Sequence, residues 1–159
     1  MFTFDVTTLL GFHNVVSVAA IPLGLIVTWG FLNARAFPLI TLLFLAALVA
    51  TSVTGFLFPF TDFGPAHIIG AVSLVVLFVA LLGRYVFRLR GPWRPVYVIA
   101  AVLALWLNVF VAIVQAFQKI PEFNMLAPTG TELPFAIVQG VAFLAFGWLA
   151  VRGAQQFHH

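Results

Sequence analysis

The chain has 159 residues, of which 64% are hydrophobic and only 7% are charged. Soluble domains carry about a quarter charged residues, so this composition cannot cover a globule with polar surface and requires lipid as the main solvent. The net charge of +3 comes mainly from arginines in short loops, a pattern typical of membrane topology and not of nucleic-acid binding. Cysteine is absent, which excludes disulfides, thiolate metal sites, thiol catalysis and iron–sulfur ligation.

Five apolar stretches each approach or exceed the roughly 20 residues that a helix needs to cross a bilayer. The predicted spans are residues 9–32, 37–58, 65–87, 95–118 and 133–152. Short loops with Pro and Gly separate them, and the longest loop runs from Lys119 to Glu132. We therefore expect a single domain over residues 1–159, an all-α integral membrane bundle of five antiparallel transmembrane helices.

The charged residues fall between the spans or at their ends, and successive gaps alternate in sign. The acidic gaps hold Asp5, Asp62, Glu122 and Glu132, and the basic gaps hold Arg35, Arg84, Arg88, Arg90, Arg94 and Arg152. Because Arg and Lys remain on the cytoplasmic side, the pattern predicts an outside N-terminus and a cytoplasmic C-terminus in a multi-pass protein of the cell inner membrane.

Aromatic and small residues add two further patterns. Residues expected to anchor the cytoplasmic interface are Trp29, Trp93, Trp148, Tyr85 and Tyr97. Small residues four apart would allow helices to approach closely, although alanine and glycine are also common in such helices. These pairs are Ala20 and Gly24, Ala66 and Gly70, and Ala136 and Gly140.

Polar side chains within the spans gather in the half of the bilayer next to the acidic loops. They are His13, Asn14, Ser17, Thr51, Ser52, Thr54, His67, Ser73, Gln115 and Gln139, with Asn108 nearer the middle. Polar groups in hydrocarbon are costly unless they face protein or water, so this layer is predicted to form a ligand or cofactor site in the outer leaflet. The alternative is that these groups bond their own helix or join neighbouring helices.

His13 and His67 open the first and third spans, which run parallel, so the two rings are expected at similar depth. Two imidazoles can supply both axial nitrogens of haem iron, and Ser17 and Gly70, one turn further on, leave room for the flat macrocycle. Tetrahedral zinc takes three or four ligands, and Asp62 alone is near enough in sequence to add a third. We therefore expect His13 and His67 as metal ligands of haem b.

Amides within the spans would orient the edge of the cofactor, which is haem b or a quinone. The candidates are Asn108, Gln115 and Gln139. His158 and His159 end the chain and are left out of the site.

Three short motifs carry a resemblance to known proteins. They are Gly11-Phe12-His13-Asn14, Thr54-Gly55-Phe56 and Pro65-Ala66-His67-Ile68-Ile69-Gly70. This order of His, Thr-Gly and His resembles small uncharacterised bacterial multi-pass membrane proteins that are similar in outline to b-type membrane cytochromes, over about the first 90 residues. Those cytochromes have two histidine pairs stacked across the bilayer, whereas this chain has one. The resemblance therefore implies at most one haem, near the outer surface.

Residue types missing from the spans narrow the function. No Asp, Glu or Lys lies inside a predicted span, which argues against proton-coupled carriers and retinal proteins. Three interpretations remain: electron transfer with haem b or a quinone, a noncatalytic accessory subunit of a larger membrane complex, and a small channel or carrier for a neutral solute. Whether the chain is an enzyme stays open. The expected partners are the lipid bilayer and a quinone or a larger complex, with a homo-oligomer as a further alternative and no nucleic acid.

Overall fold

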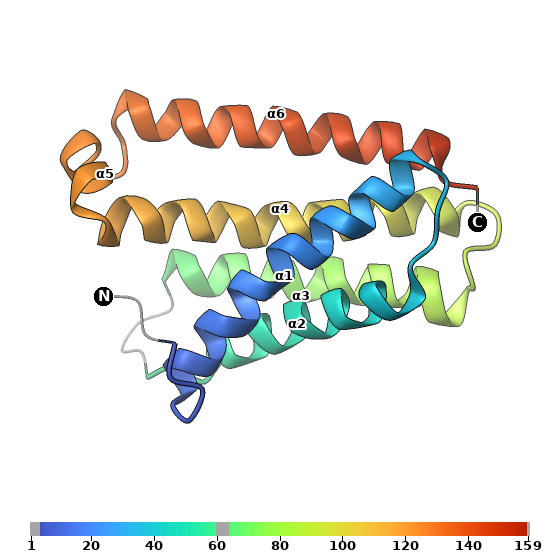
Figure 1. Ribbon diagram of the computed structural model, residues 1–159, viewed down its shortest axis with the longest axis horizontal. Helices are drawn as coiled ribbons and strands as arrows, with labels where there is room; N and C mark the ends of the chain where they lie inside the picture. Colours follow the sequence, from blue (N-terminus) through green and yellow to red (C-terminus); the bar gives the residue numbers. More distant parts are fainter. Residues whose placement is uncertain (1–3, 60–63, 159) are drawn as a thin grey trace.

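The computed structural model describes residues 4–59 and 64–158, and these form helices connected by short loops, with no strand among them (Figure 1). The elements are α1 (Leu9–Leu32), α2 (Pro38–Phe56), α3 (Pro65–Leu81), the π-helical turn η1 (Leu82–Val86), α4 (Trp93–Lys119), α5 (Pro121–Leu126) and α6 (Leu133–Gln156).

Five of these helices, α3 and η1 counted as one, are long and apolar enough to cross a membrane, which confirms the all-α class and the number of spans. The ends of α1 coincide with the prediction, and most of the other ends differ by a few residues. The short helix α5 was not predicted. Pro121 stands at its first turn, where the missing N–H of proline costs no hydrogen bond, and the helix ends after six residues.

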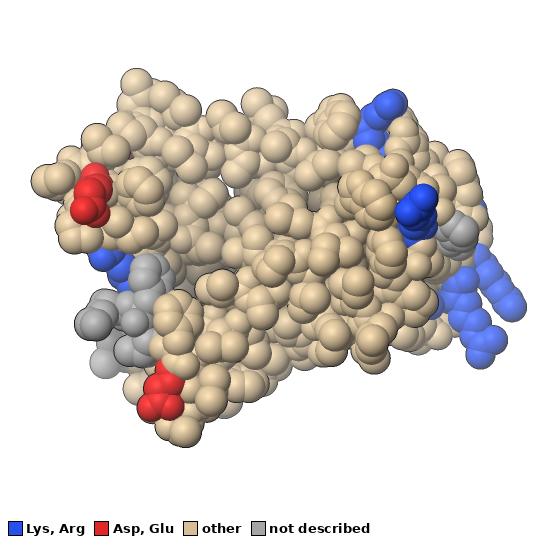
Figure 2. Space-filling view, viewed as in Figure 1, with Lys and Arg blue, Asp and Glu red and all other residues tan. Residues whose placement is uncertain are grey.

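α2, α3, α4 and α6 run along the long axis of the molecule, while α1 crosses the bundle obliquely (Figure 1). α6 packs mainly on α4, and its most apolar part has no buried residue. The acidic side chains of the described residues lie at one end of the molecule together with Lys119, and the other basic side chains gather at the opposite end (Figure 2). We call the first, with Asp5, Glu122 and Glu132, the acidic end, and the second, with all the arginines, the arginine end.

The buried core lies toward the arginine end. Its largest fully buried side chains include Tyr97, Phe44, Phe157, Leu45 and Val98. A Cβ atom on Gly24 would come within 2.6 Å of both Leu105 and Phe44, so the absence of a side chain lets α1 lie directly against α2 and α4 there. The predicted close approach at Ala20 and Gly24 is confirmed, because both residues are buried.

Two other predictions, a close helix contact at Ala136 and Gly140 and an interfacial position for Tyr97, are wrong. A Cβ atom on Gly140 would meet nothing within 4 Å, so Ala136 and Gly140 do not form a close helix contact at that position. Tyr97 is 0% exposed, whereas Trp29, Trp148 and Tyr85 are 46–58% exposed. Tyr97 was therefore wrongly predicted as an interfacial anchor. Its ring packs edge-on against Phe31 inside the core.

Candidate functional site

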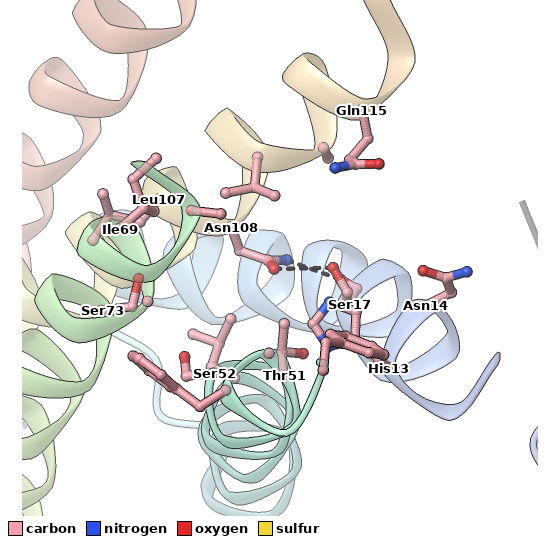
Figure 3. Close-up of a pocket in the computed structure, with 18 of the residues that line it drawn as sticks. His13, Asn14, Ser17, Thr51, Ser52, Ile69, Ser73, Leu107, Asn108 and Gln115 are labelled. Atoms are coloured by element: carbon pink, nitrogen blue, oxygen red, sulfur yellow. Dashed lines mark hydrogen bonds between the residues drawn. The ribbon is translucent and has the colours of Figure 1, made fainter. Parts of the chain in front are cut away.

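A cavity of about 450 Å³ lies between α1, α2, α3 and α4 in the half of the bundle nearer the acidic end. Its polar lining residues are His13, Asn14, Ser17, Thr51, Ser52, His67, Ser73, Asn108, Gln115 and Lys119. The close-up shows polar side chains from all four helices, among them Ser17 of α1, Thr51 of α2, Ser73 of α3 and Asn108 of α4 (Figure 3). The predicted polar layer is therefore brought together in space, with apolar walls that include Leu48, Leu77 and Leu107.

The oblique course of α1 accounts for the hollow. α1 contacts α4 closely where Gly24 faces Leu105, nearer the arginine end. Toward the acidic end α1 turns away from the line of α4, and the two helices separate (Figure 1). The surface is hollowed in this region (Figure 2). The cavity is thus a wedge whose closed side is the close-packed core.

Ser17 and Asn108 join α1 to α4 across this wedge (Figure 3). The Asn108 Nδ2 group donates to the Ser17 carbonyl oxygen at 2.8 Å, and the Ser17 hydroxyl donates to Asn108 Oδ1 at 3.1 Å. Asn108 is only 8% exposed, so its amide is hydrogen-bonded as a buried polar group requires. The Nδ2 and Oδ1 atoms of Asn108 each have capacity for one more hydrogen bond at the cavity wall.

The His13 ring is held by Thr54 of α2. The Thr54 hydroxyl donates to the Ala50 carbonyl oxygen at 2.6 Å, so its lone pair is left to accept from His13 Nδ1, which lies 2.8 Å away. This network places the ring proton on Nδ1 and leaves a lone pair on Nε2. Phe58 packs edge-on against the ring with centroids 5.1 Å apart. His13 is therefore a fixed acceptor in the cavity wall.

Thr54 itself is buried and does not line the cavity. The sequence placed it in the polar layer but did not indicate its role as the group that orients His13. A spacing argument could not have found this role, because the two residues lie on different helices and 41 positions apart.

His67 has a different environment, although it lines the same cavity. It stands in the first turn of α3, and its Nδ1 atom accepts a hydrogen bond from the Gly64 backbone N–H at 3.2 Å. An Nδ1 atom that accepts has no proton, so the neutral ring carries its proton on Nε2. The two histidines thus hold opposite tautomers, and His67 serves as a cap for its own helix.

The predicted haem b can be tested against these contacts. Coordination through Nε2 of His67 would need the proton on Nδ1 and the loss of the Gly64 hydrogen bond. Gly70, expected to leave room for a macrocycle, lies against the Phe56 ring, since a Cβ atom there would be 3.1 Å from it. Haem would therefore require both His67 and Phe56 to move. Only the His13 environment fits an axial ligand as it stands.

No group of three His, Asp or Glu side chains within residues 4–59 and 64–158 is arranged to hold a metal ion. Asp62, the expected third ligand for zinc, lies outside the described residues.

Two predicted amides end up in different places. Gln115 lines the cavity on the last part of α4. Gln139 lies instead between α6 and α4, where its Nε2 group donates to the Phe110 carbonyl oxygen at 3.2 Å. Lys119 also lines the cavity and was missed, because the predicted span ended at residue 118 whereas α4 continues through Lys119.

Comparison of the chain with protein-family models, with curated proteins and with solved structures finds no match.

Proposed function

We propose that this protein binds a neutral, lipid-soluble ring compound of the quinone class in the cavity between α1, α2, α3 and α4. The observation that supports this most directly is the His13 ring, which Thr54 holds with its Nε2 lone pair available at the wall of a cavity with apolar surfaces. A hydroquinone hydroxyl donates a hydrogen bond, and Nε2 of His13 is the matching acceptor.

The remaining lining suits the same ligand. Gln115 supplies amide N–H donors for a quinone carbonyl oxygen, while Leu48 and Leu77 provide apolar contact for the ring and tail. Acidic side chains are absent from the described lining, and Lys119 is its one charged residue. A neutral ligand with one polar edge satisfies such a site without burying an unpaired charge.

Haem b ranks second among the cofactors because two contacts would have to change to admit it. His67 would lose its bond to Gly64, and Phe56 would leave the face of Gly70. A quinone ring needs neither change.

We also propose the orientation of the chain. Arginine is retained on the cytoplasmic side of membranes, so the arginine end would face the cytoplasm and the cavity would lie in the outer leaflet half of the bacterial inner membrane. The segregation of charge between the two ends supports this (Figure 2).

The test is binding of decylubiquinol, the hydroquinone form, to the protein kept reduced and purified in mild detergent, with a visible spectrum recorded on the same sample. We expect about one bound quinone per chain and no Soret band. His13→Ala and Thr54→Val should each weaken binding by about tenfold, the equivalent of 1.4 kcal/mol for a lost hydrogen bond. Thr54→Val keeps the size of the side chain and removes only the group that orients His13.

His158→Ala is the matched control, because this histidine lies in the exposed C-terminal tail, outside the cavity, and should not alter binding. A reduced spectrum with a Soret band and narrow alpha and beta bands that disappears in His13→Ala would replace the quinone by haem b. Equal decylubiquinol affinity of the wild type and His13→Ala would refute the proposed site.

A further inference from the structure

A second hollow, separate from the cavity, runs along the surface between α2 and α3. It is a groove of about 460 Å³ lined by Leu42, Leu45, Ala46, Val49, Ala50, Val53, Leu81 and Tyr85. Ala46 and Ala50 lie one turn apart on α2, and their small side chains leave the groove open. Apart from the Tyr85 hydroxyl, every lining side chain is a hydrocarbon.

The groove has the length of one leaflet. Between Leu42 and Val53, α2 rises about 16 Å at 1.5 Å per residue. The hydrocarbon core of a bilayer is about 30 Å thick, so half of it is about 15 Å. Leu42 lies four residues from the arginine end of α2 and Val53 lies three residues from its other end, so the groove has the length of a single acyl chain and is centred near the middle of the helix.

Arg84 does not itself line the groove, but it directly precedes the lining residue Tyr85 in the π-helical turn η1. Its guanidinium carbon lies 5.6 Å from the centroid of the Tyr85 ring and 5.5 Å from that of Tyr97. Tyr97 is fully buried, so one of these two rings is fixed in the core. The planar guanidinium is thus held in place by aromatic faces, an arrangement that reduces the entropy lost when an anion binds.

One hydrogen-bond donor of Arg84 is unused within the described residues. Its Nε atom is buried and has no hydrogen-bond partner there. The described acidic residues all lie at the opposite end of the molecule, so no carboxylate of this part of the chain can serve as its counter-ion. Arg88, Arg90 and Arg94 follow in the adjoining segment and add positive charge. This end of the groove is therefore complementary to an anion.

We infer that the groove and Arg84 together bind one anionic phospholipid, with an acyl chain along α2 and α3 and the phosphate on the Arg84 guanidinium. The shape selects a hydrocarbon chain, and the positive charge selects a net negative headgroup. A second copy of this chain fits less well, since copies inserted in the same orientation would bring their arginine ends together. The inference does not depend on which ligand occupies the cavity.

Native mass spectrometry of the protein, released from micelles with equal amounts of phosphatidylglycerol and phosphatidylcholine of the same chain length, tests this inference. The wild type should retain one phosphatidylglycerol in preference to phosphatidylcholine. Arg84→Gln should reduce that retention at least about fivefold, because it removes the positively charged guanidinium group that would bind the phosphate. Arg152→Gln is the matched control, since it removes the same charge at the same end but on α6.

A second pair of variants tests the groove without changing any charge. Ala46→Phe fills the groove and should also reduce phosphatidylglycerol retention, whereas Ala145→Phe adds the same bulk to an exposed position of α6 and should not. Equal losses in Arg84→Gln and Arg152→Gln would show attraction by general charge and overturn the inference. Full retention in Ala46→Phe, or loss of a dimer instead of a lipid in that variant, would overturn it as well.

Discussion

The two halves of this bundle differ in packing, although the same four helices run through both. Toward the arginine end, Phe44 and Leu45 are 1% exposed and Gly24 lets α1 lie against its neighbours. Toward the acidic end, α1 diverges from α4 and leaves a cavity of about 450 Å³ with histidine, amide and hydroxyl groups in its walls. Tight packing in one half can hold the helices in place while the other half remains open for a ligand.

The halves also differ in how their contacts stabilise the fold. Lipid tails are as apolar as leucine, so helix association in a membrane depends on close van der Waals packing and interhelical hydrogen bonds. The arginine half supplies mainly the first, and the acidic half mainly the second, through Ser17 with Asn108 and His13 with Thr54. Substitutions in the two halves should therefore have effects of different kind and size.

The largest expected effect concerns labelling from outside the cell: a reagent that cannot cross the membrane should reach the acidic end and should not reach the arginine end. The chain has no native cysteine, so a single introduced cysteine reports one position. Met125→Cys, at a side chain 75% exposed near the acidic end, should react with a membrane-impermeant maleimide in intact cells, and Arg90→Cys should react only after lysis. Reaction at Arg90→Cys alone would reverse the proposed orientation.

Next in size is the loss of a large core side chain. Phe44→Ala should lower the free energy of unfolding by about 3 kcal/mol, because the close-packed half cannot collapse onto the space. Phe58→Ala, which removes a ring that already borders the cavity, should cost about 1 kcal/mol or less. The measurement is unfolding in mixed micelles by titration with sodium dodecyl sulfate. Equal losses would mean that the two halves are packed alike.

The hydrogen bonds that join α1 to α4 should matter less. Asn108→Leu removes the 2.8 Å and 3.1 Å bonds to Ser17 and should cost about 1–2 kcal/mol, the upper range for interhelical bonds in membranes. Ser17→Ala removes only the 3.1 Å bond, since Asn108 still binds the backbone carbonyl, and should cost less. The same unfolding titration compares them. An Asn108→Leu protein as stable as the wild type would show that these hydrogen bonds do not stabilise the contact between α1 and α4.

Two glutamines offer a matched pair for the cavity itself. Gln115→Leu should weaken decylubiquinone binding about threefold to tenfold, because a neutral hydrogen bond contributes about 1 kcal/mol. Gln139→Leu makes the same change at a residue outside the cavity and should leave affinity unchanged. Isothermal titration calorimetry with decylubiquinone measures the affinity of both variants. Equal weakening in both would indicate an indirect effect of helix packing.

The smallest expected effect concerns the turn that precedes α1. Hydrogen bonds from the Thr7 hydroxyl and backbone N–H lower the pKa of Asp5, so its stabilising contribution is present above the unfolded pKa of about 3.9 and is lost as the pH falls through the folded value. The protection of the Thr7 and Thr8 amides, measured as exchange relative to the intrinsic rate at each pH, should therefore fall below about pH 4. Asp5→Asn should exchange faster at neutral pH and lack this acid dependence. An unchanged pH profile would contradict the role of the carboxylate.

Hydropathy, charge order and the clustering of polar residues were sufficient to predict five helices, the separation of acidic from arginine-containing loops, and most residues of the polar layer near the acidic end. These are properties of single segments, because the cost of placing a side chain in hydrocarbon depends little on its neighbours along the chain. For the same reason, the bounds of α1 were predicted as the structure has them.

The tertiary structure decided which members of the polar layer form one site. The direction of α1 opened the wedge, and the rotation of α6 placed Gln139 outside it. At the arginine end, packing against Phe31 enclosed Tyr97 in the core. The partner of each histidine, Thr54 for His13 and Gly64 for His67, decided where each ring carries its proton. Helix crossing angles and rotations depend on all contacting side chains at once, so a pattern along one segment does not determine them.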